Sequence, residues 1–227
     1  MRITADAREA TKRRILHAAS DLFSERGWDS ATTRDIATAA GIATGTLFNY
    51  FPTKEAIATC LASEALARAS AEFHAKRGSD SATDAPLEED LFLLIWIGLR
   101  HLLPYRKFMV QALSSVLSPL ATTARVAKTK DDGGESIQSL HLDLAAKLVA
   151  EHGAQKASPV ALQLYWSLYL GVLAHWAVDD SPHQEDTVAL LDQSLILFTG
   201  VLQNLPQKAK LYDEDFGSEM ESGREAD

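Results

Sequence analysis

The segment from Thr33 to Phe51 constrains the fold of this 227-residue chain more strongly than any other stretch. Apolar residues in its first half recur at intervals of about one helical turn, and Gly41 follows where a helix needs a residue that tolerates a left-handed conformation. Beyond the glycine, Leu47 and Phe51 lie four residues apart, so they share one face of a second short helix. The pattern predicts two helices joined by a tight turn, which is a helix-turn-helix.

The other faces of the second helix are small and polar, with two aromatic rings. Short side chains let a helix approach base edges in the major groove of DNA, where hydroxyls and amides make hydrogen bonds. This composition therefore predicts DNA contacts by Thr44, Gly45, Thr46, Phe48, Asn49 and Tyr50. For Phe48 the alternative is a ring that only packs within the protein.

One amphipathic helix is expected before this motif and another after it. Apolar residues from Ile15 to Phe23 follow the spacing i, i+3, i+4, i+7 and i+8, and the pattern stops at Gly27. After the motif, Thr53 can cap a long helix. We therefore expect a three-helix DNA-binding domain over residues 1–53, joined by that long helix to the rest of the chain.

The net charge of -9 is distributed unevenly along the chain. Residues 1–57 carry eight basic and seven acidic side chains, a balance of +1, so the remainder carries a net charge of -10. A nearly neutral end joined to an acidic body would orient the molecule on a polyanion and limit non-specific binding. The charge distribution is therefore compatible with DNA binding by the first domain.

The chain from residue 54 to residue 206 is predicted to form a second helical domain. The segment 87–103 is apolar on all sides, which is typical of a helix at the centre of a core. Further helices are expected over residues 105–117 and 135–152, with a loop at 128–134 between them. The sequence thus predicts an all-α protein with a larger C-terminal domain for ligand binding and dimerisation.

Two helices with similar beginnings complete this domain. Ser158-Pro159 and Ser181-Pro182 each place a serine at the cap and a proline at the first helical position. Both helices carry more apolar surface than one core can cover, so we expect them to form a homodimer interface. Residues 207–227 are acidic and lack periodicity, which predicts a disordered tail.

Aromatic and polar residues gather on the central helices of the second domain. A pocket lined by aromatic rings with a few polar groups suits a largely apolar small molecule, and Arg100 or His101 could bind an anionic group on it. The candidate ligand-binding residues are Trp96, Arg100, His101, Tyr105, Phe108, Met109, Tyr165, Trp166 and Tyr169, with Gln111 and His141 in the same set. The alternative is that these residues are only core or interface.

Motifs for catalysis, metal binding or cofactor binding are not found. The seven histidines lack partners at ligand spacing, and there is no glycine-rich phosphate loop or nucleophile elbow. The single cysteine, Cys60, cannot form an intramolecular disulfide and is expected to pack in a helix. We therefore expect no metal, no cofactor and no enzymatic activity, and a cytoplasmic protein without a membrane segment.

Together these motifs resemble the TetR family of bacterial transcriptional regulators. The residues that carry the resemblance are Ile15 to Ala19, Leu22-Phe23, Gly27-Trp28, Thr32 to Ala37, Ala40 to Ala43, Gly45 to Phe51 and Lys54-Glu55. The resemblance implies an all-α homodimer with DNA-binding helices at one end and a ligand-responsive core behind them. It also adds Thr33, Arg34 and Lys54 to the residues expected to face DNA.

Two positions depart from the pattern that is common in this family. Phe48 stands where many members have tyrosine, so a hydroxyl that could bind a phosphate is absent. Ala43 stands where many members have serine, which removes a helix cap worth about 1 kcal/mol unless Thr44 replaces it. Neither departure changes the expected fold.

The sequence therefore predicts a dimeric repressor that an unknown small molecule releases from a palindromic operator in double-stranded DNA. One alternative is a protein of the same fold that acts in chromosome organisation or cell division. The other is a helical small-molecule-binding protein without a role at promoters.

Overall fold

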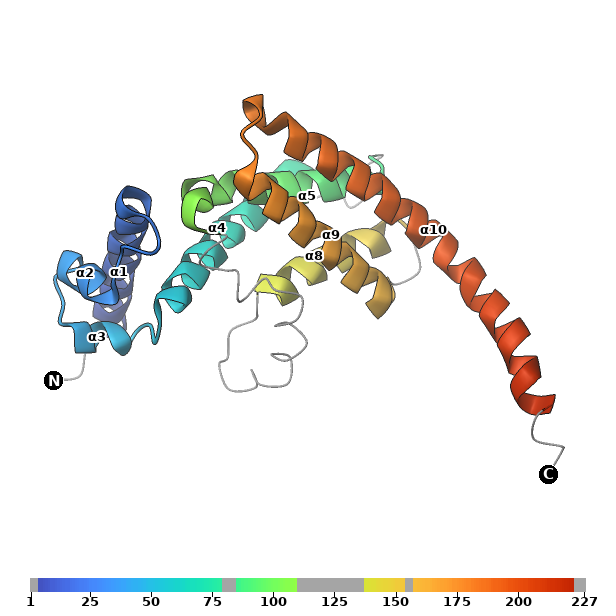
Figure 1. The fold of residues 1–227 in the computed structure, drawn as a ribbon, viewed down its shortest axis with the longest axis horizontal. Coiled ribbons are helices and arrows are strands. Elements are labelled where there is room, and N and C mark those ends of the chain that lie inside the picture. Colours follow the sequence, from blue (N-terminus) through green and yellow to red (C-terminus); the bar gives the residue numbers. More distant parts are fainter. Residues whose placement is uncertain (1–3, 79–84, 110–136, 154–156, 223–227) are drawn as a thin grey trace.

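The computed structural model describes residues 4–78, 85–109, 137–153 and 157–222, with side chains as far as Gln203. Within these ranges every regular element is helical, which confirms the predicted all-α class (Figure 1). The elements are α1 (Ala5–Arg26), α2 (Thr33–Ala39), α3 (Thr44–Phe48), α4 (Lys54–Arg77), α5 (Leu87–Leu102), η1 (Leu103–Tyr105), α8 (Ile137–Glu151), α9 (Pro159–Val178), η2 (Pro182–Gln184) and α10 (Glu185–Ser222).

The first three helices form a small unit at one end of the molecule (Figure 1). Ile15 of α1, Ile36 of α2 and Leu47 of α3 are fully buried, as their spacing predicted. Gly41 has φ +66° in the turn between α2 and α3, a conformation that glycine adopts without steric cost. These observations confirm the helix-turn-helix. We call α1, α2 and α3 the DNA-binding unit.

Helices α4 and α5 lie side by side and run in opposite directions behind this unit (Figure 1). Thr53 caps α4 by accepting the backbone N–H of Ala56 at 3.1 Å, as predicted. Helix α5 contacts α4, α8, α9 and α10, and Leu91, Ile95 and Ile97 along it are buried. The expectation of a central apolar helix is confirmed, because only a helix covered on several sides can bury residues all round.

Helix α9 begins as predicted, with the Ser158 hydroxyl accepting the backbone N–H of Ala161 at 3.1 Å. The Ser181-Pro182 signal starts a helical segment, as predicted, but α10 itself begins three residues later, at Glu185. Residues 182–184 form a short 3₁₀ turn in which His183 has φ +53°, and this left-handed conformation separates the turn from α10. The Ser181 hydroxyl accepts the backbone N–H of Asp186 at 3.1 Å, and the carboxylate of Asp179 accepts that of Thr187 at 2.9 Å, so both side chains cap α10.

The prediction of a disordered tail also differs from the structure, in which the α10 backbone is helical as far as Ser222 (Figure 1). Each residue added to an existing helix gains a hydrogen bond without a new nucleation step. Residues 207–211 are also favourable or neutral helix formers apart from any apolar pattern. Periodicity alone therefore underestimated the length of this helix.

Two other predictions fall outside the described residues. One is the loop at 128–134, and the other is most of the helix expected over 105–117, because the structure describes that segment only as far as residue 109. In the part of the chain that the structure describes, no helix is both long enough and apolar enough to cross a membrane.

Candidate nucleic-acid interface

The outward face of α3 carries most of the residues predicted to contact DNA. Gly45 and Asn49 are exposed, Thr44 and Thr46 are half-buried, and the Phe48 side chain is 48% exposed. A ring buried only for packing would not keep half of its surface in solvent, so the exposure of Phe48 favours the DNA-facing interpretation. The structure therefore brings the α3 candidates together on one surface.

The beginning of α2 adds to this surface. Arg34 is exposed and Thr33 is half-buried. The Thr32 hydroxyl accepts the backbone N–H of Asp35 at 3.2 Å, and the Asp35 carboxylate accepts the backbone N–H of Thr32 at 3.1 Å. Hydrogen bonds from Thr32 lower the pKa of Asp35 below its ordinary range, so the carboxylate is ionised at neutral pH and the capping box is intact.

Helix α3 begins without such a cap. Ala43 occupies the N-cap position, where its methyl group cannot accept a hydrogen bond. The Thr44 hydroxyl does not cap the helix in its place. The helix contains only five residues, too few for stability on helix propensity alone. It is therefore held by the burial of Leu47 within it and of Phe51 just after it.

Helix α1 places two arginines, Arg8 and Arg14, close to this surface. The guanidinium of Arg8 lies 5.8 Å from the centre of the Tyr50 ring, within the range of a cation–π interaction. The Arg14 guanidinium reaches the turn between α2 and α3, 4.0 Å from where a side chain on Gly41 would begin. The run of basic residues in α1 was visible in the sequence, but which of them point toward α3 depends on helix packing.

Lys54 makes contacts within the protein that the sequence did not predict. Its ammonium donates to the carbonyl oxygens of Trp28 at 2.6 Å and Ala31 at 3.2 Å, and it lies 4.3 Å from the centre of the Trp28 ring. The side chain therefore ties the start of α4 to the segment between α1 and α2. A phosphate contact through the remaining N–H of Lys54 stays a prediction.

The candidate ligand-binding residues divide into separate groups. Arg100 and His101, expected to bind an anionic part of a ligand, both contact Glu72 of α4, with distances of 2.8 Å from Arg100 Nη2 to Oε1 and from His101 Nε2 to Oε2. The His101 hydrogen bond, with a second one from Lys76, lowers the pKa of Glu72 to about 2. These contacts hold α4 against α5, so a ligand anion would have to displace Glu72.

A second group lies against the DNA-binding unit. Phe108 is 1% exposed, and its ring centre lies 4.8 Å from that of Phe23 in α1 and 6.0 Å from that of Tyr105. Met109, the next residue, is also buried. Sequence reasoning placed these residues in a ligand pocket because aromatic composition does not distinguish a pocket from a domain junction.

The third group lies between α8 and α9 and joins His141 to Tyr165, Trp166 and Tyr169. All four side chains are buried. The His141 and Tyr169 ring centres are 4.2 Å apart, and His141 Nε2 is hydrogen-bonded to the Tyr165 hydroxyl at 2.9 Å. Burial lowers the pKa of His141 to about 4 and raises that of Tyr165, so both side chains are neutral at neutral pH. We call these four residues the aromatic cluster.

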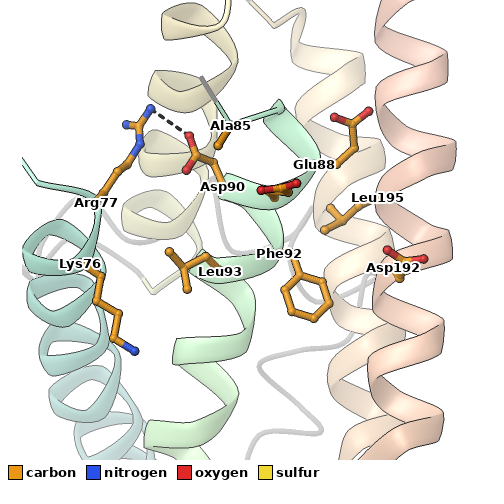
Figure 2. Close-up of a pocket in the computed structure, with 10 residues that line it drawn as sticks. Lys76, Arg77, Ala85, Glu88, Asp90, Phe92, Leu93, Asp192 and Leu195 are labelled. Atoms are coloured by element: carbon orange, nitrogen blue, oxygen red, sulfur yellow. Dashed lines mark ion pairs between the residues drawn. The ribbon is translucent and has the colours of Figure 1, made fainter. Parts of the chain in front are cut away.

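Trp96, the remaining candidate, stacks on Phe92 with ring centres 6.3 Å apart and belongs to none of these groups. Near Phe92 the structure has a hollow of about 460 Å³ between α4, α5 and α10 (Figure 2). Its lining residues are Lys76, Arg77, Ala85, Glu88, Glu89, Asp90, Phe92, Leu93, Asp192 and Leu195, and Arg77 points to Asp90 at 2.9 Å in Figure 2. None of the sequence-predicted ligand-binding residues lines this hollow.

Comparison with known proteins shows that both domains are similar to those of tetR-type regulatory proteins. Residues 15–59 match the model for bacterial regulatory proteins of the tetR family, and residues 91–216 match the tetracyclin repressor-like C-terminal domain. The regulator UidR of Escherichia coli K12 is 38% identical over 65 residues, which are 29% of this chain and 33% of UidR. The repressor KstR2 of Rhodococcus jostii is 49% identical over 43 residues, 19% of this chain and 21% of KstR2. The chain thus matches a third or less of the length of these curated relatives.

A solved structure extends the similarity beyond the DNA-binding unit. FadR of Thermus thermophilus, a TetR family repressor in complex with lauroyl-CoA, is 26% identical, with a TM-score of 0.61. The similarity covers 83% of this chain and 93% of that FadR chain. Since the C-terminal family match alone spans more than half of the chain, the protein belongs to the TetR family of bacterial regulatory proteins.

Proposed function

We propose that this protein is a homodimeric repressor that leaves a palindromic operator when it binds a small, largely apolar molecule. The exposed polar face of α3, held on a rigid three-helix unit, is the observation that carries the DNA-binding part. Repressors among the matched relatives, KstR2 and FadR, support the direction of regulation. In a dimer, two copies of α3 would enter successive major grooves about 34 to 36 Å apart.

The dimer interface is formed by α9 and α10. On α10, Leu190, Leu197 and Val201 are 38%, 66% and 37% exposed, and their spacing of seven and four residues places them on one helix face. Val160 and Val178 at the two ends of α9 are about 70% exposed. A second copy would cover this apolar surface in a four-helix arrangement.

Selection of random DNA by the purified full-length chain tests the DNA-binding part. We expect enrichment of one palindromic sequence, and sedimentation at about twice the chain mass of 24.7 kDa. Enriched sites next to promoters would distinguish a repressor from the alternative role in chromosome organisation. A monomer, or binding without sequence preference, would contradict the proposal.

The aromatic cluster is the proposed effector site. The indole N–H of Trp166 is buried and has no hydrogen-bond partner among the residues that the structure describes. An unpaired buried donor is unfavourable, and a ligand with a carbonyl or carboxylate oxygen would satisfy it. The neutral His141–Tyr165 pair and the surrounding rings suit an apolar chain attached to that oxygen. The lauroyl-CoA bound by Thermus thermophilus FadR has this chemistry, with an apolar chain and a thioester carbonyl.

Lauroyl-CoA is therefore the first probe, with coenzyme A alone as its control. We expect lauroyl-CoA, and not coenzyme A, to weaken binding to the selected operator. Trp166→Phe keeps the ring and removes the N–H, so it should retain operator binding and require about tenfold more lauroyl-CoA for release. Trp96→Phe is the matched control and should behave as the wild type. Operator binding that does not respond to lauroyl-CoA would reject the acyl ligand and leave DNA binding unaffected.

A further inference from the structure

Phe108 joins the DNA-binding unit to the C-terminal domain through its side chain. Its ring packs 4.8 Å from Phe23 of α1 and stacks on Trp28 at 6.4 Å with an interplanar angle of 9°. Phe23 and Trp28 contact each other at 4.9 Å, so the three rings form one group. All three are at least 92% buried. Phe108 thus inserts into the DNA-binding unit although it belongs to the chain after α5.

Arg106, two residues earlier, binds the end of α9 in the C-terminal domain. Its Nε donates to the carbonyl oxygen of Trp176 at 2.8 Å, its Nη2 donates to the carbonyl oxygen of Asp179, and its guanidinium lies 5.7 Å from the centre of the Trp176 ring. These carbonyls are at the end of α9, just before α10. The five residues Tyr105 to Met109 therefore contact both the DNA-binding unit and the junction of the two proposed dimer helices.

We propose that this segment orients the DNA-binding unit relative to the dimer interface, with Phe108 as the positioning residue. Helix α4 is the covalent connection between the domains, and Lys12 of α1 pairs with Glu64 of α4 at 3.8 Å. Together with the Lys54 bonds and the packing of α1 on α4, this pair attaches the DNA-binding unit to α4. The Phe108 contact attaches the same unit to the chain after α5, and this additional attachment restricts movement of the unit relative to the rest of the C-terminal domain.

The consequence for DNA binding follows from the two half-sites. A dimer binds both half-sites only when its two α3 helices have the correct spacing and orientation. Without the additional attachment, the DNA-binding units sample more orientations, and the affinity falls by the fraction of molecules that are competent to bind. Phe108 therefore sets operator affinity without touching DNA. This inference rests on the proposed dimer.

The test compares Phe108→Ala, Phe108→Leu and Arg106→Gln with the wild type and with Phe73→Leu as control. Phe73 of α4 is also 1% exposed, so its replacement removes a comparable buried ring away from the junction. Affinity for the selected operator is measured over a range of salt concentrations, after titration of the active fraction. Spin labels at the exposed Glu25 of α1, in a Cys60→Ala background, report the distance between the two DNA-binding units.

We expect Phe108→Ala to lower operator affinity about tenfold with an unchanged salt slope, because the phosphate contacts themselves remain. The distance distribution should broaden, and Phe108→Leu and Arg106→Gln should give smaller effects of the same kind. Folded Phe108 variants with wild-type affinity and distances would overturn the inference, as would an equal effect in Phe73→Leu. A wild type that gives no distance between copies would contradict the proposed dimer instead.

Discussion

The two sets of candidate residues differ in what their polar groups do. On the DNA-binding unit, Arg34 and Asn49 point into solvent, and the α3 candidates share one surface. In the C-terminal domain, Arg100 and His101 are paired with Glu72, and Phe108 is buried against α1. One set was predicted from a motif with a defined geometry, and the other from residue types on neighbouring helices.

The difference shows how far residue type alone can be interpreted. A residue that reads DNA must be exposed before DNA arrives, so the exposure of a polar residue on the outer face of a short helix is compatible with its predicted role. A polar residue inside a helical domain must be paired, because an unpaired buried group is unfavourable. Most candidates there are satisfied by the protein itself, and the buried N–H of Trp166 is informative because it is not.

The largest expected effect concerns the exposed apolar side chains of α10. Leu197→Asp places a charge in the proposed interface, so we expect a monomer whose operator affinity is at least about 100-fold lower, because the two half-sites are no longer bound together. Sedimentation and operator titration measure both changes. Leu140→Asp on α8, where the leucine is 46% exposed, is the control. A stable dimer of Leu197→Asp would show that α10 does not form the interface.

Lys54, the first residue of α4, tests whether a residue predicted to contact DNA is instead bound within the protein. Lys54→Ala removes a charged donor from two carbonyl oxygens, so we expect the free energy of unfolding to fall by about 2 kcal/mol. Because these bonds use two of the three N–H groups of the ammonium, we expect the salt dependence of DNA binding to keep its slope. A slope reduced by about one would instead establish a phosphate contact. Lys107→Ala, at an exposed lysine, is the control.

Asn49 tests the predicted DNA contacts of the exposed residues on α3. Asn49→Ala removes an amide that can bind a base edge, so discrimination at one base pair of each half-site should weaken about tenfold. Competition among single-base operator variants measures this loss. Thr38→Ala is a suitable control because the Thr38 hydroxyl already donates to the Arg34 carbonyl of its own helix at 2.9 Å. Unchanged discrimination at every position would remove Asn49 from the proposed interface.

The smallest expected effect is an increase in stability. Ala43→Ser restores a side-chain cap to α3, so thermal unfolding should show a stabilisation of about 1 kcal/mol. Tighter operator binding is expected to accompany it if α3 frays in the free protein. Ala43→Gly is the comparison, because glycine at this position supplies no side-chain acceptor. Equal stability of the serine and glycine variants would show that α3 depends on packing alone.

Much of the fold was predictable from local patterns. The glycine turn at Gly41, the caps at Thr32 and Ser158 and the apolar stripe of α1 each depend on residues within one or two turns of each other. The Ser181-Pro182 signal predicted the start of the last helical segment, but the second cap, Asp179, and the 3₁₀ turn before α10 were not predicted, because they depend on the backbone conformation at His183. The length of α10 was underestimated because helix propagation does not need an apolar pattern.

By itself, the sequence determined the helical class, the helix-turn-helix and the face of α3 that is exposed to solvent. Short-range spacing sets these features, since neighbours in a helix are neighbours in the chain. Only the tertiary structure decided the partners of side chains far apart in sequence. It placed Lys54 on the carbonyl of Trp28, Phe108 on Phe23, and His141 on Tyr165. These contacts join residues 24 to 85 positions apart, and they form only where helix packing brings their surfaces together.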